Sequence, residues 1–139
     1  MMSATIKWLE HMTFVSESGS GHTIVMDGHP DFGGRNLGAR PMELVLIGMG
    51  GCTLFDVVKG LNNKQGALAD CSIEVSADRA EGDPAVFTKI YMHYKIKGKN
   101  LDENKVKDII ESSINKYSSA TVMLGKTAEI KYDYKITET

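Results

Sequence analysis

The sequence predicts an α+β protein of one domain, built from a largely antiparallel sheet and two helical regions. The chain has 139 residues, enough for one domain and too few for a comfortable two. Several short stretches alternate between apolar and polar residues, which is the pattern of half-buried strands. Two longer stretches are helical in pattern, one apolar on every face and one amphipathic. The resulting order is βββ-α-ββ-α-β over residues 1–139.

Residues 1–40 are expected to form short strands followed by a loop. A Ser- and Gly-rich turn at 16–21 separates the strands, and Gly, Pro and Asp residues at 27–34 break regular structure. The alternation occupies three stretches: 6–8, 12–14 and 22–26. The loop after them delivers the chain to the first helix.

Residues 41–64 are predicted to form the central helix, because Pro41 suits a first helical turn, where its missing N–H is not needed. The first half is apolar on every face, and a chain of this length can rarely bury such a helix alone. Gly48, Gly50 and Gly51 each cost up to about 1 kcal/mol relative to Ala. Close approach of a second helix would offset that cost, so the pattern suggests a partner chain.

The same helix is not expected to cross a membrane. Its uninterrupted apolar run, Leu44 to Cys52, has nine residues, whereas a spanning helix needs about 20. Glu43 and Asp56 close the apolar segment at both ends. A buried helix is the better interpretation.

The second half of the chain is predicted to hold a strand pair, a helical region and a last strand. The strand pair spans 70–97, with a hairpin turn at 80–84. Asp102 is a reasonable N-cap for an amphipathic helix over 102–117, and a short turn at 122–124 completes the region 102–124. Clean alternation over 127–137 predicts the final strand.

Composition narrows the classes of function. Sixteen Lys and Arg against eighteen Asp and Glu give a net charge of −2, which argues against a nucleic-acid partner. Two cysteines are too few for a disulfide-rich secreted scaffold, and no signal peptide is visible at the N-terminus. The four histidines show no metal-ligand spacing, and no cofactor motif occurs. A cytoplasmic protein with reduced thiols and no metal or cofactor is expected.

Cys52 is the most informative candidate for chemistry. It is either a small apolar residue at a helix crossing or a reactive thiol. A reactive role needs a nearby cation, because the residue lies about eleven positions into the helix, where the helix dipole offers little. Arg35 and Arg40 in the preceding loop are the candidates in sequence. Cys71 lies beyond the helix end, a rise of about 18 Å from Cys52, so a disulfide is not expected and Cys71 is interpreted as a structural thiol.

Two motifs resemble those of the OsmC/Ohr family, the osmotically inducible protein C and organic hydroperoxide resistance proteins. Residues 40–52, RPMELVLIGMGGC, resemble the central-helix motif that ends in Gly-Gly-Cys. Residues 116–124, KYSSATVML, resemble the second motif, which normally holds another cysteine. The order of strands agrees across nearly the whole chain, and the YhfA-like branch of the family is the best match.

The resemblance implies an OsmC-like, intertwined homodimer in which antiparallel sheets wrap around two central helices. It also implies a reaction, thiol-dependent reduction of organic hydroperoxides at the subunit interface. Cys52 would attack the peroxide oxygen and become a sulfenic acid, a second cysteine would condense with it, and an external dithiol would reduce the pair.

Three positions depart from the family pattern. Ser118 occupies the position of the second cysteine, so the family's disulfide cannot form. Met42 stands where the peroxidases have a glutamate, and Glu43 follows one residue later, about 100° around the helix. The family's catalytic arginine lies in the N-terminal strands, whereas the first arginine of this chain is Arg35.

The residues support two functions. The first is a one-cysteine reductase of organic hydroperoxides, with Cys52 as nucleophile, Glu43 or Arg40 shaping its surroundings, and Ser118 close to the sulfur. An apolar pocket would favour organic hydroperoxides over hydrogen peroxide. The alternative is a binding protein that holds an apolar or thiol ligand at the dimer interface without turnover. A stable dimer without activity is a third possibility.

Overall fold

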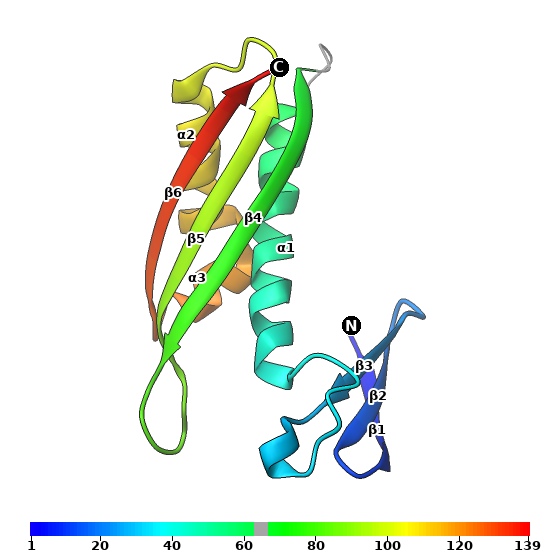
Figure 1. Cartoon of the computed structure of the whole chain (residues 1–139). Helices are drawn as coiled ribbons and strands as arrows, with labels where there is room; N and C mark the ends of the chain where they lie inside the picture. Colours follow the sequence, from blue (N-terminus) through cyan, green and yellow to red (C-terminus); the bar gives the residue numbers. More distant parts are fainter. Residues whose placement is uncertain (63–66) are drawn as a thin grey trace. The chain divides into compact units, whose positions relative to one another are not determined.

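The computed structural model describes residues 1–62 and 67–139, which divide into two compact units, Met1–Val45 and Leu46–Thr139. Each unit contains one three-stranded sheet (Figure 1). The chain contains both helices and strands, in an order that matches the one expected from the sequence. The α+β prediction is therefore confirmed.

The first unit holds an antiparallel sheet in sequence order. Its strands are β1 (Ala4–Glu10), β2 (Thr13–Ser18) and β3 (Thr23–Asp27). Apolar residues pair across the sheet, with Phe14 between Trp8 and Met26. Every residue of β1 is exposed within the chain, and the Trp8 side chain is 62% exposed. The N-terminal strands are therefore confirmed, but this unit does not cover its own apolar surface.

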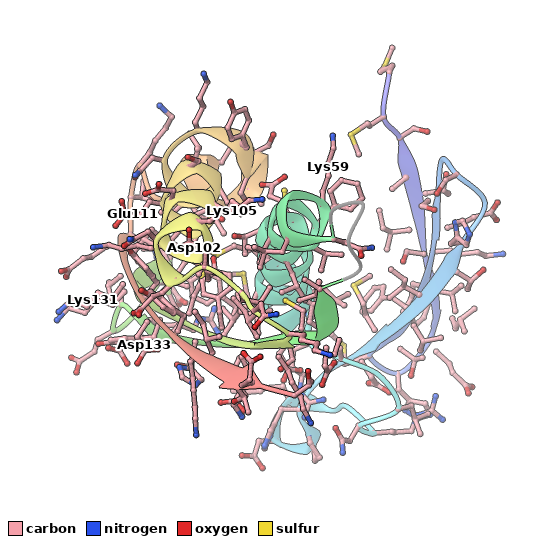
Figure 2. All side chains as sticks on the ribbon, turned by 90° about the horizontal axis from the view of Figure 1, so that it is seen from above. Lys59, Asp102, Lys105, Glu111, Lys131 and Asp133 are labelled. Atoms are coloured by element: carbon pink, nitrogen blue, oxygen red, sulfur yellow. The ribbon has the colours of Figure 1, made fainter. Side chains whose placement is uncertain are left out.

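The second unit packs helices on one face of a sheet. The sheet contains β4 (Leu68–Arg79), β5 (Phe87–Gly98) and β6 (Glu129–Glu138), with β5 in the centre. The helices are α1 (Pro41–Leu61), of which residues 46–61 belong to this unit, α2 (Glu103–Ser112) and α3 (Ser119–Leu124). Figures 1 and 2 show α1 and α2 side by side on the same face of the sheet.

The core of this unit lies between the helices and the sheet. The alternation along β5 buries Ile90, Met92, Tyr94 and Ile96, which face the helices. From the helices the buried apolar residues are Met49, Val57, Leu61, Val106 and Ile110. Burial at spacings of three to four residues is the expected inner stripe of a helix. The opposite face of the sheet is charged, with Lys95 Nζ 2.6 Å from Glu74 Oε1.

The sheet of this unit is mixed, so one strand pair departs from the largely antiparallel pairing that was expected. β4 and β5 form the predicted antiparallel hairpin, but β6 runs parallel to β5, with Tyr94 opposite Tyr134. The reason is the connection: the helices between β5 and β6 carry the chain back to the end of the sheet where β5 begins. A crossover of that kind makes neighbouring strands parallel.

The second helical region departs from the predicted single helix over 102–117. Regular α-helix ends at Ser112, and a π turn, η2 (Ser113–Tyr117), follows it. The Ser118 N–H donates to Ser113 O at 2.8 Å, which is the five-residue spacing of π structure. The expected turn at 122–124 is part of the helix α3.

α1 is long and apolar enough to cross a membrane by length and composition. The complete helix, of 21 residues, is longer than the nine-residue apolar run from which a span was judged in the sequence. The helix is instead identified as a core helix by its buried stripe of Met49, Thr53, Val57 and Leu61. The predicted end at residue 64 falls outside the described residues.

Candidate active site

Cys52 lies in the middle of α1, in the second unit. Its thiol is free and the residue is half-buried. The following residue, Thr53, is fully buried toward the sheet and α2. Phe55, on the other side of the helix, is 68% exposed. Cys52 therefore sits at the border between the packed side of α1 and an uncovered apolar side.

The glycines before Cys52 have two different surroundings. A Cβ added to Gly50 would lie 3.1 Å from Val75 Cγ2, so this glycine lets α1 approach β4 of the same chain. A Cβ on Gly48 or Gly51 would meet no atom within 4 Å. Close packing against a second helix was the expected reason for all three glycines. At Gly50 that reason is wrong, because the close neighbour is the chain's own sheet.

An apolar hollow lies on the uncovered side of α1. Its volume is about 470 Å³, and its lining comes entirely from one stretch of the helix: Gly51, Leu54, Phe55, Val58 and Lys59. Ile47, one turn before Gly51, is 62% exposed. An uncovered apolar surface of this kind marks a site for a ligand or a partner chain.

Ser118 is fully buried and forms the N-cap of α3. Its Oγ lies 2.7 Å from Thr121 Oγ1 and accepts a hydrogen bond from the Thr121 N–H at 3.3 Å. Within the described residues no hydrogen bond joins Ser118 to Cys52. The hydroxyl at the position of the family's second cysteine is thus engaged in helix capping.

A buried chain of hydroxyl groups connects α1 to β5 and to the π turn. Thr53 Oγ1 lies 2.7 Å from Tyr94 OH and 2.8 Å from Ser113 Oγ, and Ser113 Oγ donates to Asp56 Oδ2 at 2.8 Å. Because Ser113 has one proton and gives it to a carboxylate, Thr53 must donate to Ser113 and Tyr94 to Thr53. The chain of donors therefore ends on the Asp56 carboxylate, one helical turn after Cys52.

Burial, the largest cause, raises the pKa of Tyr94 to about 12, against a smaller lowering by the Thr53 hydrogen bond. Sequence reasoning placed Tyr94 within the strand pair over 70–97 but found none of its partners. The signal that could have found them is the presence of Thr53 and Ser113, polar residues on otherwise apolar helix faces.

Cys71 is half-buried in β4, opposite Ile96 of β5. Burial and, to a smaller extent, the neighbouring Asp70 carboxylate together raise the pKa of its thiol to about 11. Both effects keep this sulfur protonated near neutral pH. Cys71 is therefore a poor nucleophile, which agrees with its interpretation as a structural thiol.

The other predicted site residues, Glu43 and Arg40, lie in the first unit at the start of α1. Glu43 Oε1 accepts a hydrogen bond from the Arg40 N–H at 2.7 Å, the backward half of a capping box. The Arg40 guanidinium donates to Asn36 Oδ1 at 2.8 Å and to Gly38 O at 3.2 Å. Both side chains thus organise the loop that leads into the helix.

Arg35 is also engaged within the first unit. Its guanidinium donates to Glu10 Oε1 at 3.1 Å and to Thr13 Oγ1 at 3.0 Å. Beside it, Asp27 is 1% exposed and accepts hydrogen bonds from the N–H groups of residues 28, 35 and 37 and from the Thr13 hydroxyl. Burial opposes its charge, but these hydrogen bonds together lower the pKa of Asp27. Sequence reasoning treated Asp27 only as a turn residue.

Metal ligation has no candidate among residues 1–62 and 67–139, because no group of three or more suitable side chains occurs there. His93 Nδ1 lies 2.5 Å from Asp133 Oδ1 on the outer face of the sheet.

Comparisons with known proteins agree on one family. The model of the family described as OsmC-like protein matches residues 33–133. The protein YhfA of Escherichia coli K12 is 36% identical over 135 residues, which cover 97% of this chain and 98% of YhfA. An OsmC-like protein from Mycoplasma pneumoniae has a TM-score of 0.82 at 17% identity, covering 99% of this chain and 97% of its own. An organic hydroperoxide resistance protein OsmC from Legionella pneumophila has a TM-score of 0.72 at 14% identity, covering 97% and 96%.

Proposed function

Because the chain belongs to the OsmC-like family, we propose that it is a thiol-dependent reductase of organic hydroperoxides that acts in oxidative stress defence. The observation that carries the proposal is the position of Cys52, a free thiol beside an uncovered apolar hollow. The fold is also that of proteins named for organic hydroperoxide resistance. Members of the family are soluble proteins, and we place this one in the cytoplasm.

The proposed reaction uses one cysteine. The Cys52 thiolate attacks the peroxide oxygen, the O–O bond breaks, an alcohol leaves, and Cys52 becomes a sulfenic acid. Ser118 has no sulfur to resolve this acid, and its hydroxyl caps α3. Cys71 lies on β4 and its pKa is raised. An external thiol or dithiol must therefore return Cys52 to its reduced form.

The proposal includes a homodimer in which a second copy covers the apolar side of α1. Ile47 and Phe55 are 62% and 68% exposed in the single chain, and both lie on this side. Gly48 and Gly51 have open space where a side chain would stand, which permits close approach of another helix. In the first unit Ile6 and Trp8 are 57% and 62% exposed. Apolar surface of this extent is unusual on a monomer.

Arg40 and Glu43 are proposed to shape the surroundings of the reactive thiol, since activation of Cys52 needs a cation. The matched substitutions Arg40→Lys and Arg40→Gln separate this role from loop structure. Gln removes the charge and Lys retains it, so a larger loss of peroxidase rate in Arg40→Gln supports the proposal. Equal rates in the two variants contradict a role for the charge.

The test of the function is the loss of cumene hydroperoxide in the presence of dithiothreitol. The expected result is consumption by the wild type and by Cys71→Ser, and no consumption by Cys52→Ser. Activity in Cys52→Ser equal to that of the wild type would overturn the proposal. Loss of activity in both cysteine variants would instead assign the chemistry to more than one thiol.

The second candidate is a binding protein for an apolar or thiol ligand at the dimer interface. The engagement of Ser118 in capping favours it, because no second sulfur is available within the motif. The two candidates differ in the reactivity of Cys52. In pH-dependent alkylation, a Cys52 pKa well below about 8.5 supports the reductase, and a higher value supports the binding protein.

A further inference from the structure

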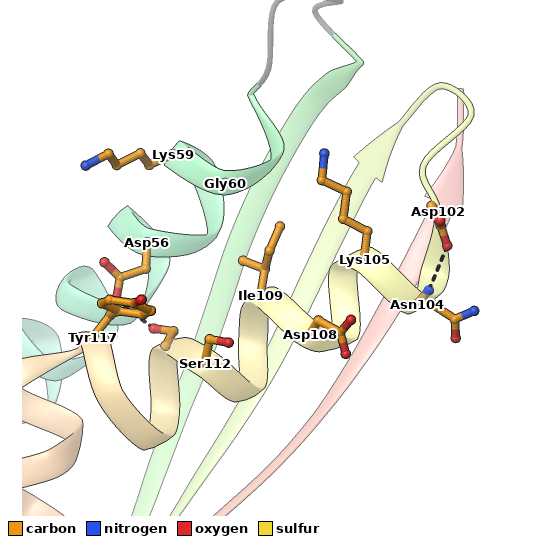
Figure 3. Close-up of a pocket in the computed structure, with 11 residues that line it drawn as sticks. Asp56, Lys59, Gly60, Asp102, Asn104, Lys105, Asp108, Ile109, Ser112 and Tyr117 are labelled. Atoms are coloured by element: carbon orange, nitrogen blue, oxygen red, sulfur yellow. Dashed lines mark hydrogen bonds between the residues drawn. The ribbon is translucent and has the colours of Figure 1, made fainter.

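A groove lies between the C-terminal half of α1 and α2, entirely within the second unit (Figure 3). Its volume is about 650 Å³, the size of sites that hold small ligands. Gly60 and Ile109 meet in it: a Cβ on Gly60 would come within 2.9 Å of Ile109 Cδ1. The two helices therefore approach closely there and give the groove an apolar floor.

One end of the groove combines a carboxylate with an aromatic ring. Asp56 and Tyr117 both line the groove, and they overlap in the view of Figure 3. Asp56 Oδ2 is held by the Ser113 hydroxyl, while Oδ1 has no hydrogen bond among the described residues. The Tyr117 ring already takes one cation, with Lys116 Nζ 5.2 Å from its centroid. A free carboxylate oxygen and an aromatic ring in the lining of one groove are each suited to a ligand ammonium group.

The π turn creates this end. Ser113 begins the turn and Tyr117 ends it. The turn therefore supplies both the hydroxyl that holds the Asp56 carboxylate and an aromatic ring that lines the groove. Turns of this kind are rare and are frequent at functional sites.

The α2 side of the groove carries one cation, Lys105, together with the carboxylates of Asp102 and Asp108. Lys105 lines the groove, and in Figure 3 its ammonium group extends toward the Gly60 region of α1, away from Asp56. Within the described residues Lys105 belongs to none of the ion pairs. Lys107, two residues later on the same helix, does not line the groove. A carboxylate bound at Lys105 would lie apart from an amine bound at Asp56.

We propose that the groove binds a zwitterionic thiol of amino-acid to tripeptide size, and that this thiol is the external reductant of Cys52. The inference rests on the proposed function. Asp56 follows Cys52 by four residues, a rise of about 6 Å on the same side of the helix, so a ligand amine at Asp56 places the molecule one turn from the sulfur. The thiol class follows from the proposed reaction, because Ser118 has no sulfur and Cys52 and Cys71 are both free thiols that form no disulfide with each other.

The reaction balances with two thiols. The first thiol attacks the Cys52 sulfenic acid, a mixed disulfide forms, and water leaves. The second thiol attacks the ligand sulfur of that mixed disulfide, which releases the ligand disulfide and the Cys52 thiolate. In total one hydroperoxide and two thiols give one alcohol, one disulfide and one water.

Binding is tested with S-methylglutathione, which has the charges of a thiol tripeptide and cannot react. Calorimetric titration into the reduced full-length protein should show binding by the wild type and by Lys107→Gln. Asp56→Asn and Lys105→Gln should each weaken it by about tenfold, since each removes one charge-assisted contact. Absence of binding to the wild type, or equal binding by Lys105→Gln, overturns the inference.

Turnover gives the second readout. With cumene hydroperoxide, Lys105→Gln should lower kcat/KM for glutathione relative to that for 2-mercaptoethanol by about tenfold, and Lys107→Gln should leave the ratio unchanged. An unchanged ratio in Lys105→Gln overturns the reductant role. Failure of the proposed function looks different: no hydroperoxide is then lost with either thiol, whatever the variant.

Discussion

Thr53 shows how a single hydroxyl ties the candidate site to the core. Its Oγ1 reaches both Tyr94 on β5 and Ser113 in the π turn, which is 60 positions away in sequence. Neither partner could be assigned from the sequence, because alternation places a residue on a face without saying which residue of another element it meets. Tyr94 is fully buried, and its hydrogen bond to Thr53 is seen only in the folded structure.

We expect Thr53→Val to lower the free energy of unfolding by about 1–3 kcal/mol, because it leaves the buried Tyr94 and Ser113 hydroxyls without their shared partner. Urea denaturation measures the change. Thr137→Val, an exposed threonine on β6, serves as the control and should be close to neutral. Equal midpoints for Thr53→Val and the wild type would contradict the network's contribution.

Cys71 gives stability a dependence on pH. Its folded pKa of about 11 lies above the ordinary 9.0, so folding favours the protonated thiol. That contribution is complete below pH 9 and is lost as the pH rises toward 11. As the pH rises from 9 to 11, the free energy of unfolding should fall more for the wild type than for Cys71→Ser. Urea denaturation at each pH measures it. Parallel losses in the two proteins would show that the thiol is not responsible.

At the scale of elements, the sequence predicted the positions of helices and strands along the chain better than the pairing direction of the strands or the local form of the helices. Alternation over 127–137 predicted β6 correctly, but a strand's pattern is the same in either direction, so its parallel pairing with β5 could not be read. The spacing of Val106, Ile110 and Ile114 fits an α-helix continuing to Tyr117. The π turn adds one residue to a turn of the backbone, so Ser113 and Ser118 are buried, while Tyr117 is 61% exposed.

The N-cap of α2 was predicted and is present, with Asp102 Oδ1 accepting from the Asn104 N–H at 2.9 Å. Asp102→Ala should lower the free energy of unfolding by about 0.5–2 kcal/mol. Asp102→Asn retains a capping oxygen and should fall within a few tenths of a kcal/mol of the wild type. Both values come from urea denaturation followed by circular dichroism. An equal loss in the two variants would mean that charge, rather than capping, matters at this position.

At the scale of the whole molecule, the exposed side of α1 is the feature that a single chain leaves unexplained. The sequence predicted burial on every face, and the chain itself buries only the side toward its sheet and α2. Gly50 is accounted for within the chain, whereas Gly48, Gly51 and Phe55 are not. The sequence pattern suggested a partner chain, but the residues of one sequence do not say which surface of a partner would cover this side of α1.

Phe55→Glu should convert the proposed dimer to a monomer, because it places a charge on the apolar side of the helix. Sedimentation velocity at micromolar concentration measures the change. The matched control is Tyr91→Glu, on the outer face of the sheet, which should remain dimeric. A wild type that sediments as a folded monomer would contradict the dimer.

The central claim is that Cys52 is the sulfur that hydroperoxide oxidises. The reduced protein should be treated with one equivalent of cumene hydroperoxide in the presence of dimedone and then digested for mass spectrometry. We expect a dimedone adduct on the peptide that contains Cys52, with Cys71 unmodified, and hydroperoxide consumed in equal amount. An unmodified Cys52 after the hydroperoxide has been consumed, or hydroperoxide that persists beside the reduced thiol, would contradict the account.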